Sequence, residues 1–173
     1  MSQTLPDLLH TTPFTAQAVD RLAQVLRHRG WRLRTAESCT GGLIAATCTA
    51  FSGSSDWFDR GHVTYSNAAK TEDLGVPAGL IGAHGAVSAE VAQAMVQGLV
   101  AGAPQVVGVA VTGVAGPTGG TPDKPVGLVY LAWSVSGRVW AARHHWPGDR
   151  SAVRAATVEC ALQTLVHACE DHP

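Results

Sequence analysis

Apolar positions in the first third of the chain follow a helical period and then a strand period. From Thr15 they recur with the i, i+3, i+4, i+7 spacing of an amphipathic helix, and Gly30 stands where a helix C-cap belongs. Residues 31–35 then alternate apolar and polar side chains, which predicts a strand. After a short polar run, residues 43–50 are almost wholly apolar or small, which predicts a buried helix.

The middle of the chain contains two further strands and two capped helices. Residues 60–65 predict a strand, and Ser66-Asn67 then predicts the cap of a short helix that ends near Gly75. Ser88 predicts the cap of the next helix, which has apolar residues on one face. Residues 105–112 form a nearly continuous run of small and β-branched side chains, as in a central strand covered on both faces.

The last third predicts a hairpin and a long helix. Strands over 126–135 and 139–146 flank Ser136-Gly137, which indicates a hairpin turn, and Asp149 can cap the final helix. The order of the elements predicts an α/β layered fold around a mixed sheet, with an antiparallel hairpin at or near one edge.

Length and composition favour one compact domain. The chain has 173 residues, of which 46% are hydrophobic and only 14% are charged, as expected for a buried sheet or for surface covered by a partner subunit. Residues 1–14 are interpreted as a loose lead-in and 15–173 as a single domain.

Charge and hydropathy argue against nucleic acid and membrane. The net charge is −1, and no cluster of Lys and Arg is present that would favour nucleic acid or an anionic membrane. No apolar run approaches the roughly 20 residues that span a bilayer, and the N-terminus lacks the pattern of a secretory signal. We therefore expect a cytoplasmic protein.

Polar clusters follow three of the predicted strands. Residues 37–40 come after the first, 65–70 after the second and 112–113 after the third. If these strands are parallel neighbours, the clusters meet at one edge of the sheet, where α/β proteins form their sites. Ser38 would then be a nucleophile beside a helix N-terminus, although Ser38 or Thr40 could simply cap that helix.

A serine nucleophile needs a base, and Lys70 is the favoured candidate. It falls in the first turn of the predicted short helix, where the helix dipole disfavours a cation and so lowers the lysine pKa. A solvated surface lysine is the alternative. Tyr65 could relay a proton or simply pack. None of the histidines considered has an obvious paired carboxylate: they are His62, His84, His144 and His145.

The four cysteines lack the spacing of zinc ligands, and free thiols are the simplest interpretation. Cys48, Cys160 and Cys169 lie in helical stretches and are interpreted as small core residues. Cys39 differs because it adjoins Ser38, and it remains an alternative nucleophile.

The glycine-rich run 113–125 is too long for a tight turn, and such loops are often functional. Its glycines let backbone N–H groups approach a ligand, but it matches neither the Walker A nor the dinucleotide pattern. Arg150 and Arg154 near the start of the final helix are candidate phosphate partners, or else members of a solvated face.

Five motifs in the same order resemble the C-terminal domain of the competence-damage-inducible (CinA) protein family, over about residues 15–170. They are TAESCTGG at 35–42, YSNAAK at 65–70, GAVS at 85–88, TGVAGP at 112–117 continuing to KPVG at 124–127, and GDR at 148–150.

The resemblance implies a nicotinamide-nucleotide amidohydrolase of pyridine nucleotide salvage, which converts nicotinamide mononucleotide and water to nicotinic acid mononucleotide and ammonia. It implies a Ser38–Lys70 dyad with Tyr65 beside it, a three-layer α/β/α sandwich, a homo-oligomer, and no metal or other cofactor. Longer family members carry an additional N-terminal domain, so this chain resembles the stand-alone form.

Substrate contacts are expected around the dyad and the glycine loop. The expected residues are Glu37, Thr40, Gly41, Gly42, Thr112, Gly113, Gly116 and Arg150. Two other functions stay open: a nucleotide-binding module without turnover, and a Ser/Lys amidase that acts on another amide.

Overall fold

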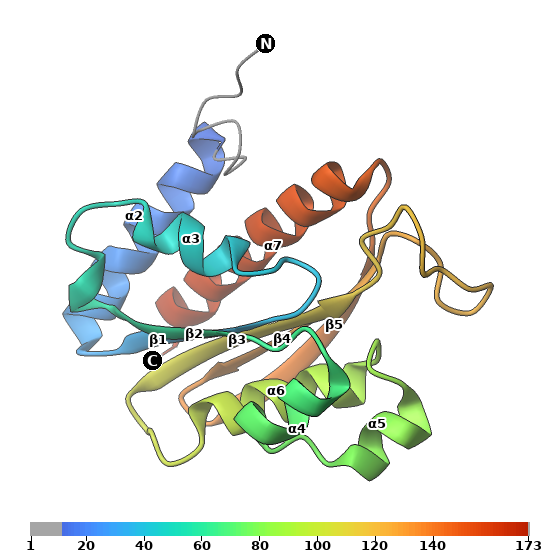
Figure 1. Cartoon of the computed structure of the whole chain (residues 1–173). Coiled ribbons are helices and arrows are strands. Elements are labelled where there is room, and N and C mark those ends of the chain that lie inside the picture. Colours follow the sequence, from blue (N-terminus) through green and yellow to red (C-terminus); the bar gives the residue numbers. More distant parts are fainter. Residues whose placement is uncertain (1–11, 173) are drawn as a thin grey trace.

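Three parallel strands and an antiparallel hairpin make up the sheet of the computed structural model, which describes residues 12–172 (Figure 1). The strand order is β2-β1-β3-β4-β5; β1 pairs in parallel with β2 and β3, and β4 is antiparallel to both of its neighbours. The strands are β1 (Arg32–Glu37), β2 (Phe58–Val63), β3 (Val106–Gly113), β4 (Leu128–Val135) and β5 (Arg138–His145).

Helices cover both faces of the sheet, which confirms the predicted α/β/α sandwich (Figure 1). One layer consists of α2 (Pro13–Arg29), α3 (Leu43–Thr49) and α7 (Arg150–Glu170), and a 3₁₀ turn, η1 (Ser54–Asp56), precedes β2. The other layer consists of α4 (Asn67–Leu74), α5 (Ala78–His84) and α6 (Ala89–Val100). No helix within 12–172 has both the length and the apolarity needed to cross a bilayer.

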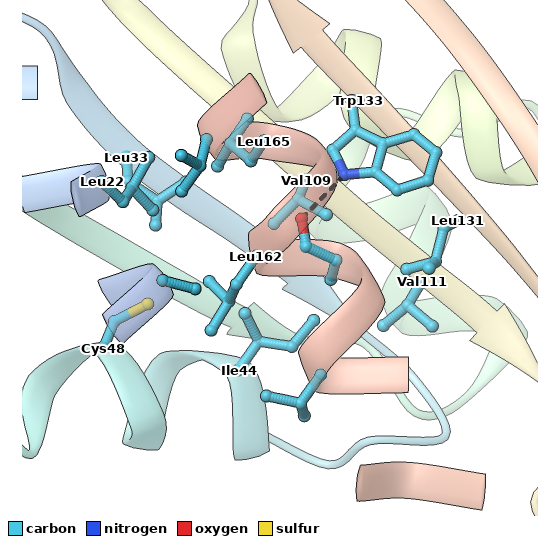
Figure 2. Packing of buried hydrophobic residues seen from close by; sticks show 14 of the residues in the cluster. Leu22, Leu33, Ile44, Cys48, Val109, Val111, Leu131, Trp133, Leu162 and Leu165 are labelled. Atoms are coloured by element: carbon cyan, nitrogen blue, oxygen red, sulfur yellow. Dashed lines mark hydrogen bonds between the residues drawn. The ribbon is translucent and has the colours of Figure 1, made fainter. Parts of the chain in front are cut away.

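The two faces of the sheet differ in the size of their side chains. Val107, Val109 and Val111 of β3 join the core beneath α2, α3 and α7, where Trp133 donates a hydrogen bond from Nε1 to the Ala161 carbonyl at 3.1 Å (Figure 2). On the opposite face β3 presents Ala110, and α6 packs closely there. Because side chains alternate along a strand, β3 thus places larger side chains on one face of the sheet and smaller ones on the other.

Most predicted elements are confirmed, although several ends shift by one or two residues; β4, for example, begins at Leu128 rather than at 126. Helix α2 begins at Pro13, because the Thr12 hydroxyl caps it, so residues 12–14 do not belong to a lead-in; the rest of that predicted segment, 1–11, lies outside the described residues. Strand β2 ends at Val63 rather than at Tyr65. Helix α5 was not predicted: it has no side-chain cap and buries only Ile81, so its sequence carries almost no periodic signal.

Close packing between α4 and α6 depends on Gly98. A Cβ atom at this position would lie 1.8 Å from the carbonyl oxygen of Leu74, a backbone atom. We therefore expect Gly98→Ala to lower the free energy of unfolding by about 1–3 kcal/mol, the usual cost of overpacking, as measured by urea denaturation.

The matched control is Gly82→Ala in α5, where nothing lies within 4 Å of the added Cβ. This control should gain stability, because alanine is the better helix former. Equal stability of the two variants would contradict the packing of α4 on α6.

Candidate functional site

Ser38 and Thr64 lie side by side at the carboxyl ends of two parallel strands. Ser38 follows β1 directly, and its N–H donates to the Val111 carbonyl at 3.1 Å, so it extends the ladder to β3. The N–H of Thr64, just beyond β2, donates to the Glu37 carbonyl at 2.8 Å. The chain after β1 turns into α3 on one face of the sheet, and the chain after β2 turns into α4 on the other (Figure 1). A crevice at such a divergence is where α/β sheets place their sites.

Lys70 reaches Ser38 from α4. The Ser66 hydroxyl caps this helix by accepting from the Ala69 N–H at 3.0 Å, and Lys70 lies one position further along. Its side chain is 1% exposed, and Nζ donates to the Thr64 carbonyl at 2.7 Å and lies 3.1 Å from Ser38 Oγ. The structure thus brings together the two residues expected to form a dyad.

Burial lowers the pKa of the Lys70 amine. Removal from water lowers its pKa, because the charged form loses solvation, and the nearby Cys39 thiol opposes this shift to a smaller extent. No carboxylate forms an ion pair with Lys70 among residues 12–172. A lysine in this setting is suited to accept a proton from an adjacent hydroxyl.

The pKa of Cys39 shifts in the opposite direction from that of Lys70. Its side chain is buried, and burial is the main cause that raises the pKa of the thiol to about 11, with the Glu37 carboxylate adding to the rise. A thiol rather than a thiolate therefore stands beside Ser38 at neutral pH, and the thiolate is the reactive form. This chemistry favours Ser38 over Cys39 as the nucleophile.

Glu37 is fully buried and faces α3. Its carboxylate accepts from the Ile44 and Ala45 N–H groups at 3.0 and 2.9 Å, and from the Thr35 hydroxyl at 3.3 Å. A carboxylate in this position satisfies N–H groups that a helix start leaves without partners. Glu37 therefore fixes the start of α3 relative to β1, and its contact with a substrate stays a prediction.

The same contacts decide which backbone donors remain near Ser38. At the start of α3, Ile44 and Ala45 are not free donors, since their N–H groups donate to the Glu37 carboxylate. Within 12–172, the backbone N–H groups of Thr40 and Gly42 have no acceptor, whereas the Cys39 N–H donates to its own sulfur. Gly41 and Gly42 have φ of 60° and 92°, a conformation that glycine adopts without strain.

Arg150 joins three parts of the site. Its guanidinium donates to the Gly116 carbonyl at 3.1 Å and to the Tyr65 hydroxyl at 2.9 Å. Arg154, one turn further along α7, donates to the Thr40 carbonyl at 2.8 Å. A cavity of about 560 Å³ opens beside the two arginines; its lining also includes Pro117, Val126, Gly148, Asp149 and Ser151.

The other expected contact residues hold the loop after β3 in place. Thr112 is buried and donates to the Ala86 carbonyl at 2.9 Å. A Cβ at Gly113 would lie 2.7 Å from the Leu128 carbonyl oxygen, and one at Gly116 would lie 2.5 Å from a Val126 methyl group. These glycines allow close approach within the chain, and contact with a substrate stays a prediction for them.

Residues away from this edge take no part in the cluster. His144 lies 3.8 Å from the Cys160 sulfur and stacks on Trp146, while His84 contacts Glu90. No three His, Cys, Asp or Glu side chains of the described chain gather where they could bind one metal ion. Sequence reasoning missed the Thr64 carbonyl as a partner of Lys70, because a backbone acceptor leaves no trace in residue type.

The fold and this site define an α/β/α domain whose polar cluster lies beyond the carboxyl ends of parallel strands. Residues 15–169 match the model of the CinA C-terminal domain family, and the chain belongs to that family.

Individual proteins that resemble this chain are consistent with its membership of that family. The chain is 53% identical over 154 residues to the nicotinamide-nucleotide amidohydrolase PncC of Pseudomonas putida, covering 89% of this chain and 96% of that protein. It is 56% identical to a CinA-like protein of Citrifermentans bemidjiense, of which it spans only 35% of the length. The crystal structure of the competence/damage inducible protein CihA from Agrobacterium tumefaciens superposes with a TM-score of 0.89 at 39% identity, covering 99% of this chain and 100% of that one.

The role of Glu37 predicts a stability effect. We expect Glu37→Gln to lower the free energy of unfolding by about 1–3 kcal/mol, because the amide replaces an acceptor with a donor that faces the N–H groups of α3. Glu72→Gln on the exposed face of α4 is the control and should leave stability unchanged. Equal denaturation midpoints for the two variants would argue against the capping role.

Proposed function

We propose that the chain is a nicotinamide-nucleotide amidohydrolase that converts nicotinamide mononucleotide and water to nicotinic acid mononucleotide and ammonia. The observation that carries the proposal is the buried Lys70 amine at 3.1 Å from the Ser38 hydroxyl. The PncC protein of Pseudomonas putida, 53% identical over 89% of this chain, is named for this activity. The same similarity supports 15–173 as one catalytic domain.

Acylation begins with neutral Lys70. The Lys70 amine accepts the Ser38 proton while Oγ attacks the carboxamide carbon, and a tetrahedral oxyanion forms. The oxyanion then collapses, the C–N bond breaks, and the nitrogen takes the proton from Lys70 and leaves as ammonia. Ser38 now carries the acyl group as an ester, and Lys70 is neutral again.

Deacylation repeats the cycle with water. Lys70 accepts a proton from water as the water oxygen attacks the ester carbon, and the Ser38 oxygen leaves with that proton restored to it. The net change is amide plus water to carboxylic acid plus ammonia, so no redox partner or metal takes part in the balance.

Backbone donors in the turn after Ser38 would stabilise the oxyanion. The N–H groups of Thr40 and Gly42 have no acceptor in the described chain. Fixed dipoles of this kind favour charge that develops in the transition state. Glu37 supports them indirectly, since it fixes the start of α3.

The arginine cavity would hold the nucleotide part of the substrate. Arg150 and Arg154 border a space of about 560 Å³ at the N-terminus of α7, a helix of 21 residues whose dipole favours an anion there. Guanidinium groups bind phosphate through paired hydrogen bonds. The Tyr65 hydroxyl accepts a hydrogen bond at 2.9 Å from Arg150, which borders this cavity, and a direct proton relay through Tyr65 is not needed for the steps above.

We further propose a cytoplasmic homo-oligomer. Among residues 12–172, four large apolar side chains are exposed by 37–60%, namely Phe14, Phe51, Val63 and Tyr65. Contact with a second subunit would remove part of this surface from water.

Three variants test the chemistry. Ser38→Ala and Lys70→Met should each lower kcat by at least about 10³-fold, because each removes one partner of the proton transfer, whereas Cys39→Ala should keep kcat within roughly twofold. The measurement is ammonia release from nicotinamide mononucleotide. Full turnover in Lys70→Met, or loss of turnover in Cys39→Ala, would contradict these assignments.

The pH dependence follows from the lowered Lys70 pKa. Only the neutral amine accepts the Ser38 proton, so kcat/KM should rise with pH and level off above the Lys70 pKa. Because burial lowers that pKa, the midpoint should lie below the value of about 10.4 for an exposed lysine. Lys70→Arg keeps a positive charge that stays protonated, and it should be inactive throughout; a midpoint at or above 10.4 in the wild type would argue against Lys70 as the base.

Substrate truncation tests the cavity. Nicotinamide riboside lacks the phosphate, so its KM should be about 10–100-fold higher, the effect expected from losing hydrogen bonds to a charged group. Arg150→Gln should reduce this difference, whereas Arg143→Gln on the exposed side of β5 should preserve it. Equal KM values for the two substrates in the wild type would show that the cavity does not bind the phosphate.

A further inference from the structure

The loop between β3 and β4 contains a turn that closes on itself. The Thr121 N–H donates to the Lys124 carbonyl at 2.9 Å, and the Lys124 N–H donates to the Thr121 hydroxyl at 3.0 Å. Pro122 and Asp123 occupy the two central positions, which suits such a turn. The backbone of Lys124 is therefore fixed locally, and its side chain is aimed from a defined position.

Lys124 fastens this turn to the other layer of the molecule. Its ammonium group donates to the His84 carbonyl at 2.7 Å. His84 is the last residue of α5, where carbonyl groups lack partners within the helix and the dipole favours a cation. The bond joins two segments that are 40 residues apart in the sequence.

Gly85 leaves the space that this contact needs. It has φ of 74°, and a Cβ built on it would lie 2.5 Å from Lys124 Nζ. Any larger residue at 85 would displace the ammonium group. The two residues are thus fitted to each other across the corner between α5 and α6.

The start of the same loop is fixed at the arginine cavity. Arg150 donates to the Gly116 carbonyl, and the Gly127 N–H donates to the Val114 carbonyl at 2.8 Å. Pro117 and Val126, which flank the exposed part of the loop, line the cavity beside Arg150. A change at Lys124 would therefore alter the wall that faces the ligand.

We propose that Lys124 is a positioning residue for substrate binding: it ties the β3–β4 loop to the corner after α5 and so keeps the Pro117 and Val126 wall of the arginine cavity formed before the nucleotide arrives. This role rests on the proposed function. A preformed wall lowers the ordering cost of binding, and Lys124 touches neither Ser38 nor Lys70, so the effect belongs to KM and not to the chemical step.

Lys124→Ala is the first test. We expect the KM for nicotinamide mononucleotide to rise about tenfold, the consequence of losing one hydrogen bond to a charged group, with kcat within about twofold. Amide hydrogen exchange of residues 118–124 should become faster in the free protein. Unchanged KM and unchanged exchange would overturn the proposal, as would a loss of kcat at constant KM.

Gly85→Ala provides an independent route to the same change. It should raise KM and speed up loop exchange as Lys124→Ala does. Gly75→Ala is the control for a positive φ alone, because Gly75 has a φ of 67° with nothing within 4 Å of the added Cβ, although its ψ is 19° and that of Gly85 is 157°. The Lys124→Ala background therefore separates the contact from the backbone strain at Gly85. In the Lys124→Ala background, Gly85→Ala should have no further effect on KM; additive effects of the two changes would overturn the proposed contact.

Failure of the proposed hydrolysis and failure of the Lys124 positioning role can be distinguished by experiment. If the wild type releases no ammonia, the proposed hydrolysis fails, and the dissociation constant of nicotinamide mononucleotide, measured by calorimetry, replaces KM in each comparison. A tenfold weaker dissociation constant in Lys124→Ala would still support the positioning role. Absence of nucleotide binding by the wild type would overturn both.

Discussion

The contact between the Lys70 amine and the Ser38 hydroxyl depends on how two parallel strands end. β1 and β2 are neighbours, yet the helices that follow them lie on opposite faces of the sheet, so Ser38 and Lys70 meet only at the edge between them. Burying an amine is unfavourable unless a partner accepts its hydrogen atoms. The Thr64 carbonyl at 2.7 Å supplies that partner without a carboxylate, which would hold the lysine in its charged form.

Other contacts fix the surroundings of this pair. The buried Glu37 carboxylate anchors the start of α3 and leaves the turn after Ser38 with unpaired N–H groups. Arg150 connects Tyr65 with the glycine loop, and Lys124 connects the far side of that loop with α5. The proposed catalytic groups, oxyanion donors and nucleotide cavity therefore depend on contacts that Glu37, Arg150 and Lys124 make.

The sequence was sufficient to predict the features that depend on side-chain type and on the period of apolar residues. The continuous apolar run of β3, the capping residues Ser66, Ser88 and Asp149, and the Ser136-Gly137 hairpin all appear as expected, because local sequence determines them. The pairing of Ser38 with Lys70 was also predictable, since both follow strands that end at one edge. Contacts made by backbone groups, such as the Thr64 carbonyl, were not, because every residue carries the same backbone.

Glu37 and Lys124 illustrate a second limit. Both are polar residues in motifs that resemble a known family, yet the motif alone does not tell whether a side chain points into the site or into the protein. Glu37 points toward α3, and Lys124 toward the end of α5. Helix α5 itself was missed because it lacks a side-chain cap and buries one residue, so its sequence shows neither a capping signal nor an apolar period.

The most direct test measures the protonation of the lysine amines. Lys70 and Lys124 are the only lysines in the sequence, so labelling lysine with nitrogen-15 gives two side-chain signals, which a Lys124→Ala variant assigns. We predict that the Lys70 amine titrates below the ordinary value of about 10.4, because it is buried and has no carboxylate partner among residues 12–172. If Lys70 instead titrated at or above that value, it would stay charged at neutral pH and would not serve as the base for Ser38.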